Sequence, residues 1–191
     1  MTLNEIEIKI KEMLPEKRLK HSIGVAKCAS KLSEIYGYNK NEAYIAGLVH
    51  DCAKYLNQEE INKYVRIYNI DLDELEINSS ALSHSIIGAY IAKYQFGIDN
   101  PQVLSAIRYH TTGKANMSLL EKIIYIADLI EENREFSGVK ELRELVYEGK
   151  LDKAIFNSLN NTIKFVIDNN QPIHQRSIEA RNYLLKINAN S

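Results

Sequence analysis

The chain has no tryptophan, three prolines and only two cysteines among its 191 residues, and its net charge is −1. Two cysteines cannot form a disulfide framework, and they favour a reducing compartment. A charge so close to zero disfavours a general binder of nucleic acid or of membrane surfaces. Any anionic ligand must therefore be met by local positive charge rather than by the field of the whole molecule.

Long apolar runs are also missing. No stretch approaches the roughly 20 residues that span a bilayer. The first segment, MTLNEIEIKIKEML, carries early acidic residues and lacks the uninterrupted apolar core of a signal peptide. We therefore expect a cytoplasmic protein with no membrane and no nucleic-acid partner, while the oligomeric state, including a homodimer, stays open.

What the chain does contain is helical periodicity along nearly its whole length. Pairs with capping-box spacing, such as Ser118 with Glu121, open several of the predicted helices. No strand alternation, internal repeat or long Gly/Ser/Pro linker interrupts the pattern. The sequence predicts one all-α domain over residues 1–191, with site-bearing helices within 15–135 and accessory helices within 138–187.

Histidines and aspartates follow one another in a suggestive order along these helices. His50 and Asp51 close the apolar stretch 43–49, so an imidazole and a carboxylate lie side by side where a helix ends. Asp128 lies inside the apolar run IIYIADLI, where burial without a partner would cost several kcal/mol. An arginine or a helix N-terminus could satisfy one such carboxylate. A divalent metal becomes the leading hypothesis because three further histidines are available: His21, His84 and His110.

Six segments around these residues carry the most specific motifs: LKHSIGVA (19–26), AGLVHDCAKY (46–55), LSHSIIGA (82–89), IRYHTTGK (107–114), IYIADLIEENREF (124–136) and IHQRSIEARNYL (173–184). Together they resemble the HD-domain symmetrical bis(5′-nucleosyl)-tetraphosphatases, with HTTG and ADxIExxR as the most diagnostic patterns. The resemblance covers most of the chain. It implies an HD-domain helical bundle, a site for one or two iron ions, and cleavage of diadenosine tetraphosphate into two molecules of ADP.

The resemblance also implies a role for each matched residue. The implied core metal ligands are His21, His50, Asp51 and Asp128. His84 and His110 are implied either to complete a second metal site or to contact phosphates, and these six residues form the implied catalytic set. The implied substrate contacts are Arg18, His21, His84, His110, Thr111, Thr112, Asp128, Arg134 and the segment Ile173, His174, Gln175, Arg176, Ser177 and Ile178.

The donor chemistry is consistent with these roles. Mixed imidazole and carboxylate ligands suit iron, with manganese, cobalt, nickel, zinc or magnesium as substitutes, and the absence of a cysteine cluster argues against a structural zinc site. A metal lowers the pKa of bound water, so we expect a metal-activated hydroxide to attack a central phosphorus. Arg134 is expected to bind phosphate, whereas Lys20, Arg108 and Lys114 are expected to be solvated charges on helix surfaces.

Two local expectations concern elements near the site. If one rigid helix carries both Asp128 and Arg134, the arginine lies about 9 Å further along the helix axis. The segment 71–80 is polar and acidic and is predicted to be a connection.

Three other functions fit the same sequence. One is an HD-domain phosphohydrolase acting on a nucleoside monophosphate, a dNTP or a guanosine alarmone. Another is an oxygenase that holds two irons on the same scaffold. The third is a non-catalytic nucleotide sensor, although the complete set of ligand residues argues against it.

Overall fold

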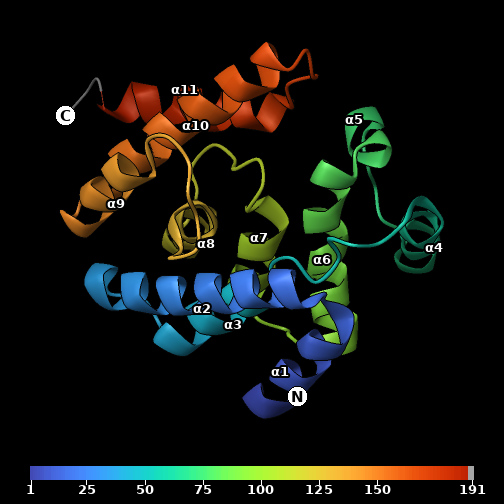
Figure 1. Ribbon diagram of the computed structural model, residues 1–191. Coiled ribbons are helices and arrows are strands. Elements are labelled where there is room, and N and C mark those ends of the chain that lie inside the picture. The colour runs from blue at the N-terminus through green and yellow to red at the C-terminus, as the bar shows by residue number, and fades with distance from the viewer. Residues whose placement is uncertain (189–191) are drawn as a thin grey trace.

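The computed structural model describes residues 1–188, with side chains described through residue 187. This part of the chain folds into helices and contains no strand, which confirms the predicted all-α class (Figure 1). None of these helices is long and apolar enough to cross a membrane. The helices are α1 (Leu3–Met13), α2 (Glu16–Tyr36), α3 (Lys40–Val49), α4 (Gln58–Tyr68), α5 (Glu74–Asn78), α6 (Ser80–Phe96), α7 (Pro101–Tyr109), α8 (Leu119–Ile130), α9 (Val139–Tyr147), α10 (Leu151–Asp168) and α11 (Gln175–Asn188).

The core is built around α2, which packs against α3 and α8, while α7 lies against α3, α6 and α8. The crossing of α2 and α3 is close because Gly47 has no side chain: a Cβ there would lie 2.8 Å from Cα of Ala26. This close approach brings the end of α3, with His50, toward His21 on α2. The apolar faces of these helices form a continuous core that includes the fully buried Leu48 and Ile124.

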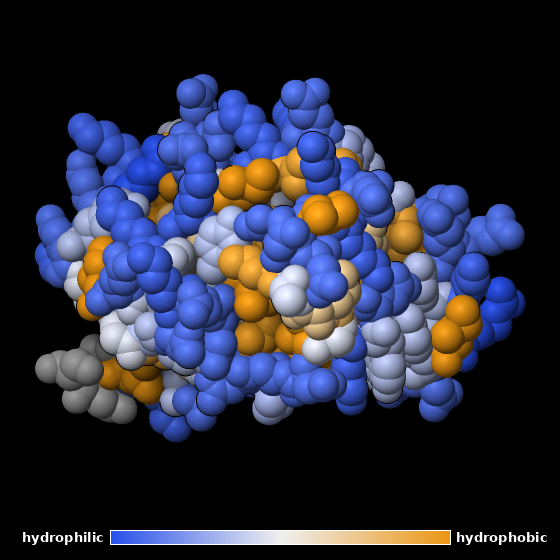
Figure 2. All heavy atoms as spheres, turned by 90° about the horizontal axis from the view of Figure 1, so that it is seen from below, coloured by the Kyte–Doolittle hydropathy of each residue, from blue (hydrophilic) through white to orange (hydrophobic). Residues whose placement is uncertain are grey.

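The C-terminal helices form a separate layer. In Figure 1, α9, α10 and α11 lie above α8, and α1 closes the opposite side of the molecule. The contacts of α9 and α10 with α8 hold this layer on the core. The face seen from below is mainly hydrophilic, with apolar residues gathered near its middle (Figure 2).

The segment 71–80 is more than a connection, which corrects the sequence-based expectation. The Asp73 carboxylate accepts a hydrogen bond from the Glu76 amide at 2.8 Å, and the Glu76 carboxylate accepts one from the Asp73 amide at 2.9 Å. These two bonds form a capping box that starts the short helix α5. The acidic composition concealed this signal because D-x-x-E fits a solvated loop equally well.

Candidate metal centre

Six predicted site residues meet where five helices converge. His21 lies on α2, His84 on α6 and Asp128 on α8, while His50 and Asp51 follow the end of α3, and His110 follows the end of α7. His21 Nε2 lies 3.0 Å from Asp128 Oδ1, and His84 Nε2 lies 3.1 Å from Asp51 Oδ1. Three overlapping groups of three have all their potential ligand atoms within 4.8 Å of one another: His21 with His50 and Asp51, His50 with His110 and Asp128, and Asp51 with His84 and His110.

Each of the four imidazoles turns its Nε2 toward this centre, because its Nδ1 is hydrogen-bonded to an oxygen on the opposite side of the ring. Three of the Nδ1–H groups donate to main-chain carbonyls. His50 donates to Gly47 at 2.6 Å, His84 to Ser80 at 2.9 Å and His110 to Ile107 at 2.8 Å. His21 Nδ1 lies 3.1 Å from the Glu131 carboxylate. A carbonyl or carboxylate oxygen can only accept, so the proton belongs on Nδ1, and Nε2 presents a lone pair.

The four Nε2 atoms and the two carboxylates of the centre are therefore acceptors with no donor among themselves. His84 Nε2 and His110 Nε2 face each other at 3.1 Å, and burial lowers the pKa of His84 to about 4, which keeps that ring neutral. The buried His50 Nε2 and Asp51 Oδ1 have no hydrogen-bond partner. A divalent cation satisfies such a set of lone pairs, so these residues fit a metal site.

Three cationic side chains surround the same centre. Arg18 Nη1 donates to Asp51 Oδ2 at 2.8 Å, and Lys54 Nζ lies 3.2 Å from His84 Nε2. Arg134 donates to the Asp128 carboxylate at 2.6 Å and to its main-chain carbonyl at 2.8 Å. Burial lowers the pKa of Lys54, although Asp51 and Asp128 oppose that shift. Positive charge is thus concentrated at one place in a chain of net charge −1.

Arg134 does not lie further along the helix of Asp128, so that expectation was wrong. Helix α8 ends at Ile130, and Glu131 has ψ of 158°, which takes the chain out of the helix. The chain then turns back and carries the guanidinium of Arg134 to Asp128. Glu131 is only 1% exposed, because its carboxylate accepts hydrogen bonds from the main chain and side chain of Asn133 and faces His21. The charged run EENRE resembled a solvated helix face and concealed this turn.

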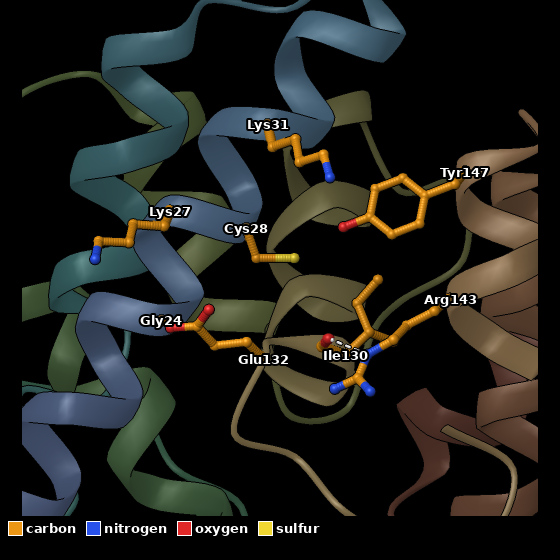
Figure 3. A pocket seen from close by; sticks show the side chains of 8 residues that line it. All are labelled: Gly24, Lys27, Cys28, Lys31, Ile130, Glu132, Arg143 and Tyr147. Atoms are coloured by element: carbon orange, nitrogen blue, oxygen red, sulfur yellow. Dashed lines mark hydrogen bonds between the residues drawn. The ribbon is translucent and has the colours of Figure 1, made fainter. Parts of the chain in front are cut away.

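Arg143 on α9 fixes the same turn from the other side, and sequence analysis missed it. Its Nε donates to the carbonyl of Ile130 at 2.9 Å, and its Nη2 donates to those of Glu131 at 2.6 Å and Arg134 at 3.0 Å. Figure 3 shows this guanidinium beside Ile130, at the edge of a cavity of about 410 Å³. A single arginine in an amphipathic helix gives no sequence signal for this role. The C-terminal layer therefore holds the loop that carries Glu131 and Arg134.

A second, largely apolar pocket of about 470 Å³ adjoins the centre through the HTTG turn. Thr111 Oγ1 lies 3.5 Å from His84 Nε2, and Thr111 and Thr112 form part of the pocket wall. Phe165 from α10 and Leu82 from α6 also line it. The structure thus places the HTTG turn between the histidine cluster and a pocket large enough for a nucleoside.

The predicted substrate segment 173–178 is divided by the structure. Ile173, His174 and Ser177 line the apolar pocket. His174 also lies 3.1 Å from Asp73 and is not among the residues of the metal centre. The other three do not line this pocket: Arg176 pairs with Glu76, Gln175 donates to Glu179 at 2.7 Å, and Ile178 is exposed.

The three cations expected on solvated surfaces have different surroundings. Lys20 is exposed, as expected. Lys114 instead pairs with the buried Glu121 at 2.9 Å, so for this residue the expectation was wrong. Arg108 and Lys114 both approach the ring of Tyr109, at 5.8 Å and 4.8 Å from its centroid. Glu121 could not be recognised as a buried partner because it also forms the capping box of α8.

Comparison with known proteins agrees with this geometry. The HD domain model matches residues 18–133. The symmetrical bis(5′-nucleosyl)-tetraphosphatase of Halalkalibacterium halodurans is 40% identical, with 92% of this chain and 93% of that protein covered. The chain belongs to the HD-domain symmetrical bis(5′-nucleosyl)-tetraphosphatase family. The enzyme of the same name from Staphylococcus aureus is 38% identical, with 96% of this chain and 94% of that protein covered.

A solved structure has the same fold over nearly the whole chain. It is that of a predicted HD superfamily hydrolase involved in NAD metabolism from Clostridium acetobutylicum, with 49% identity, a TM-score of 0.94 and 98% of each chain covered. The HD domain match ends at residue 133, before α9 begins. The similarity to this hydrolase and to the tetraphosphatases extends well beyond that point. The C-terminal layer is therefore a feature of these closer relatives.

Proposed function

We propose that this protein is a metal-dependent symmetrical bis(5′-nucleosyl)-tetraphosphatase that hydrolyses diadenosine tetraphosphate to two ADP. The observation that carries the proposal is the buried group of four imidazole Nε2 atoms and two carboxylates, with Arg18, Lys54 and Arg134 beside it. Its donors suit a metal, and its cations suit a chain of phosphates. The family relationship supports the same activity.

The proposed core ligands are His21, His50, Asp51 and Asp128, while His84 and His110 complete a second metal site or contact phosphates. Iron is the proposed metal, as one or two ions, with manganese, cobalt, nickel, zinc or magnesium as substitutes. When bound, such a metal lowers the pKa of a coordinated water and supplies a nucleophile near neutral pH.

The surrounding residues would hold the substrate in register. Arg18 and Arg134 offer planar forks that match phosphate oxygens, and Lys54 adds a point charge beside His84. A symmetrical cut requires a central phosphorus at the metal centre. One nucleoside would then occupy the apolar pocket behind Thr111 and Thr112, against Ile173, His174 and Ser177. The contacts of Gln175, Arg176 and Ile178 would support the shape of that wall.

We further propose that residues 1–191 form one domain, with the metal-site helices within 15–135 and the accessory helices within 138–187. The protein is proposed to act in the cytoplasm on small dinucleotides, without a nucleic-acid partner. Its mass by light scattering distinguishes a monomer from a homodimer.

The decisive experiment combines metal analysis of anaerobically purified protein with a nucleotide panel. The panel includes diadenosine tetraphosphate, NAD, a nucleoside monophosphate, a dNTP and a guanosine alarmone. We expect diadenosine tetraphosphate to be the best substrate and ADP to be the only product. ATP together with AMP would show that the assumed register is wrong. Turnover that depends on oxygen would instead identify an oxygenase.

A further inference from the structure

The two oxygens of Asp51 divide the metal centre into two sides. Oδ1 lies 3.1 Å from His84 Nε2 and 3.6 Å from His110 Nε2. Oδ2 lies 2.8 Å from Arg18 and 3.9 Å from His21 Nε2. The apolar pocket adjoins the first side through Thr111, and a different hollow adjoins the second side, with His21 in its wall.

This second hollow, here called the basic cleft, has a volume of about 350 Å³ and differs in charge from the apolar pocket. It lies between the start of α2, the turn after α3 and the turn after α8. Its one carboxylate, on Glu131, is already bonded to Asn133 and faces His21. No lysine or arginine lines the apolar pocket, whereas four line the basic cleft: Lys17, Arg18, Lys20 and Arg134.

Two features of the basic cleft suit a nucleotide. Lys17 and Lys20 are exposed and form no ion pair among the described residues, so their charges are available to phosphate. Tyr55 is 56% exposed and is the one aromatic ring apart from His21 in the cleft wall. An exposed tyrosine ring offers a face for a nucleobase, whatever the identity of the base.

We propose that the basic cleft is the second nucleotide subsite, in which Tyr55 stacks on the base and Lys17 and Lys20 bind the adjoining phosphates. This inference rests on the proposed function, because a dinucleoside tetraphosphate has two nucleoside ends. The metal centre lies between an apolar subsite and a basic one. The two chemically identical halves of the substrate are therefore bound in unlike surroundings.

The test compares Tyr55→Ala and Tyr55→Phe in the metal-loaded enzyme with two substrates. Diadenosine tetraphosphate has two nucleosides, and adenosine 5′-tetraphosphate has one. We expect Tyr55→Ala to raise KM for diadenosine tetraphosphate about tenfold and to leave KM for adenosine 5′-tetraphosphate unchanged, while Tyr55→Phe retains wild-type values. Tyr94→Ala is the matched control, because Tyr94 is 57% exposed and lies on α6, outside the walls of both pockets.

The lysines are tested by a double variant, Lys17→Ala with Lys20→Ala, against Lys27→Ala with Lys31→Ala on the same helix. Lys27 and Lys31 line the separate cavity of Figure 3. We expect only the first pair to raise KM for diadenosine tetraphosphate, with a weaker dependence of KM on salt than in the wild type.

The outcomes separate the two proposals. A wild-type enzyme that does not hydrolyse diadenosine tetraphosphate would overturn the proposed function itself. An active wild type in which Tyr55→Ala changes neither KM, or changes both equally, would overturn only the second subsite. Equal effects of the two lysine pairs would show that the cations act through the general charge of the molecule and would also contradict the subsite.

Discussion

The molecule contains two groupings of histidine and carboxylates, and they differ in burial and in the direction of the imidazole proton. One is the metal centre around Asp51. The other joins Asp73 and Glu76 to His174, with potential ligand atoms also within 4.8 Å of one another. In the second grouping the Arg176 guanidinium pairs with Glu76. Arg18 pairs in the same way with Asp51, but Asp73 of the second grouping is exposed, whereas Asp51 is buried.

The position of the imidazole proton is the second difference. His174 Nδ1 accepts a hydrogen bond from the main-chain amide of Arg176 at 3.1 Å, so the proton lies on Nε2 and points to Asp73 at 3.1 Å. In the metal centre the protons lie on Nδ1 and point away. The comparison teaches that suitable residues within reach fit a metal where the imidazole nitrogens face the carboxylates as lone pairs rather than as N–H donors.

The largest expected effect comes from removing a carboxylate of the metal centre. Asp51→Ala should abolish metal uptake and hydrolysis, because Asp51 adjoins His21, His50, His84 and His110 at once. Metal content by mass spectrometry and product formation measure this effect, and circular dichroism checks that the helices remain. Metal content equal to that of the wild type would mean that Asp51 is not a ligand.

A smaller effect is expected where a cation meets the substrate. Arg134→Ala should lower kcat/KM by roughly 10²–10³, corresponding to about 2.7–4 kcal/mol, since the lost contact would strengthen as charge develops on phosphate. Arg134→Lys should recover only part of the rate because the planar fork is lost. We would measure kcat/KM for both variants and check that their metal content equals that of the wild type. Wild-type kinetics in both variants would mean that Arg134 contacts Asp128 but does not bind the substrate.

The next effect tests how the imidazoles are oriented. Glu131→Gln should weaken metal affinity or activity about 10- to 100-fold, because the carboxylate that faces His21 Nδ1 becomes a neutral amide. Glu132→Gln is the matched control, since its side chain is exposed and next in the chain. The measurement is metal affinity by competition with a chelator. Equal affinities in the two variants would remove Glu131 from the site.

The smallest effect is expected in the grouping around Glu76 and His174. Glu76→Gln should leave metal content unchanged and lower the free energy of unfolding by about 1–3 kcal/mol, because Arg176 and His174 lose a charged partner. Urea unfolding measures the stability, with Glu74→Gln as an exposed control on the same helix. Loss of metal from the Glu76 variant would show that this second grouping also binds metal, which contradicts the distinction between the two groupings.

Much of the fold could be predicted because its signals are local. Helical periodicity and capping boxes, such as Ser118 with Glu121, predicted the all-α class and the start of α8, and the structure confirms both. The end of the same helix was missed. Glu131 and Arg134 are compatible with a continuing helix, and only their contacts with Asn133, His21 and Asp128 make the turn favourable.

The sequence by itself determined the types of ligand and their order along the chain, because each histidine and aspartate is visible wherever it falls. Tertiary structure alone decided which atoms face one another. The partner of His21 Nδ1 lies 110 residues away, and the partner of Glu76 lies 100 residues away. Arg143 reaches the metal-site loop only because α9 packs on α8. Proton positions and neutralising charges depend on such contacts, and no local pattern in the sequence encodes them.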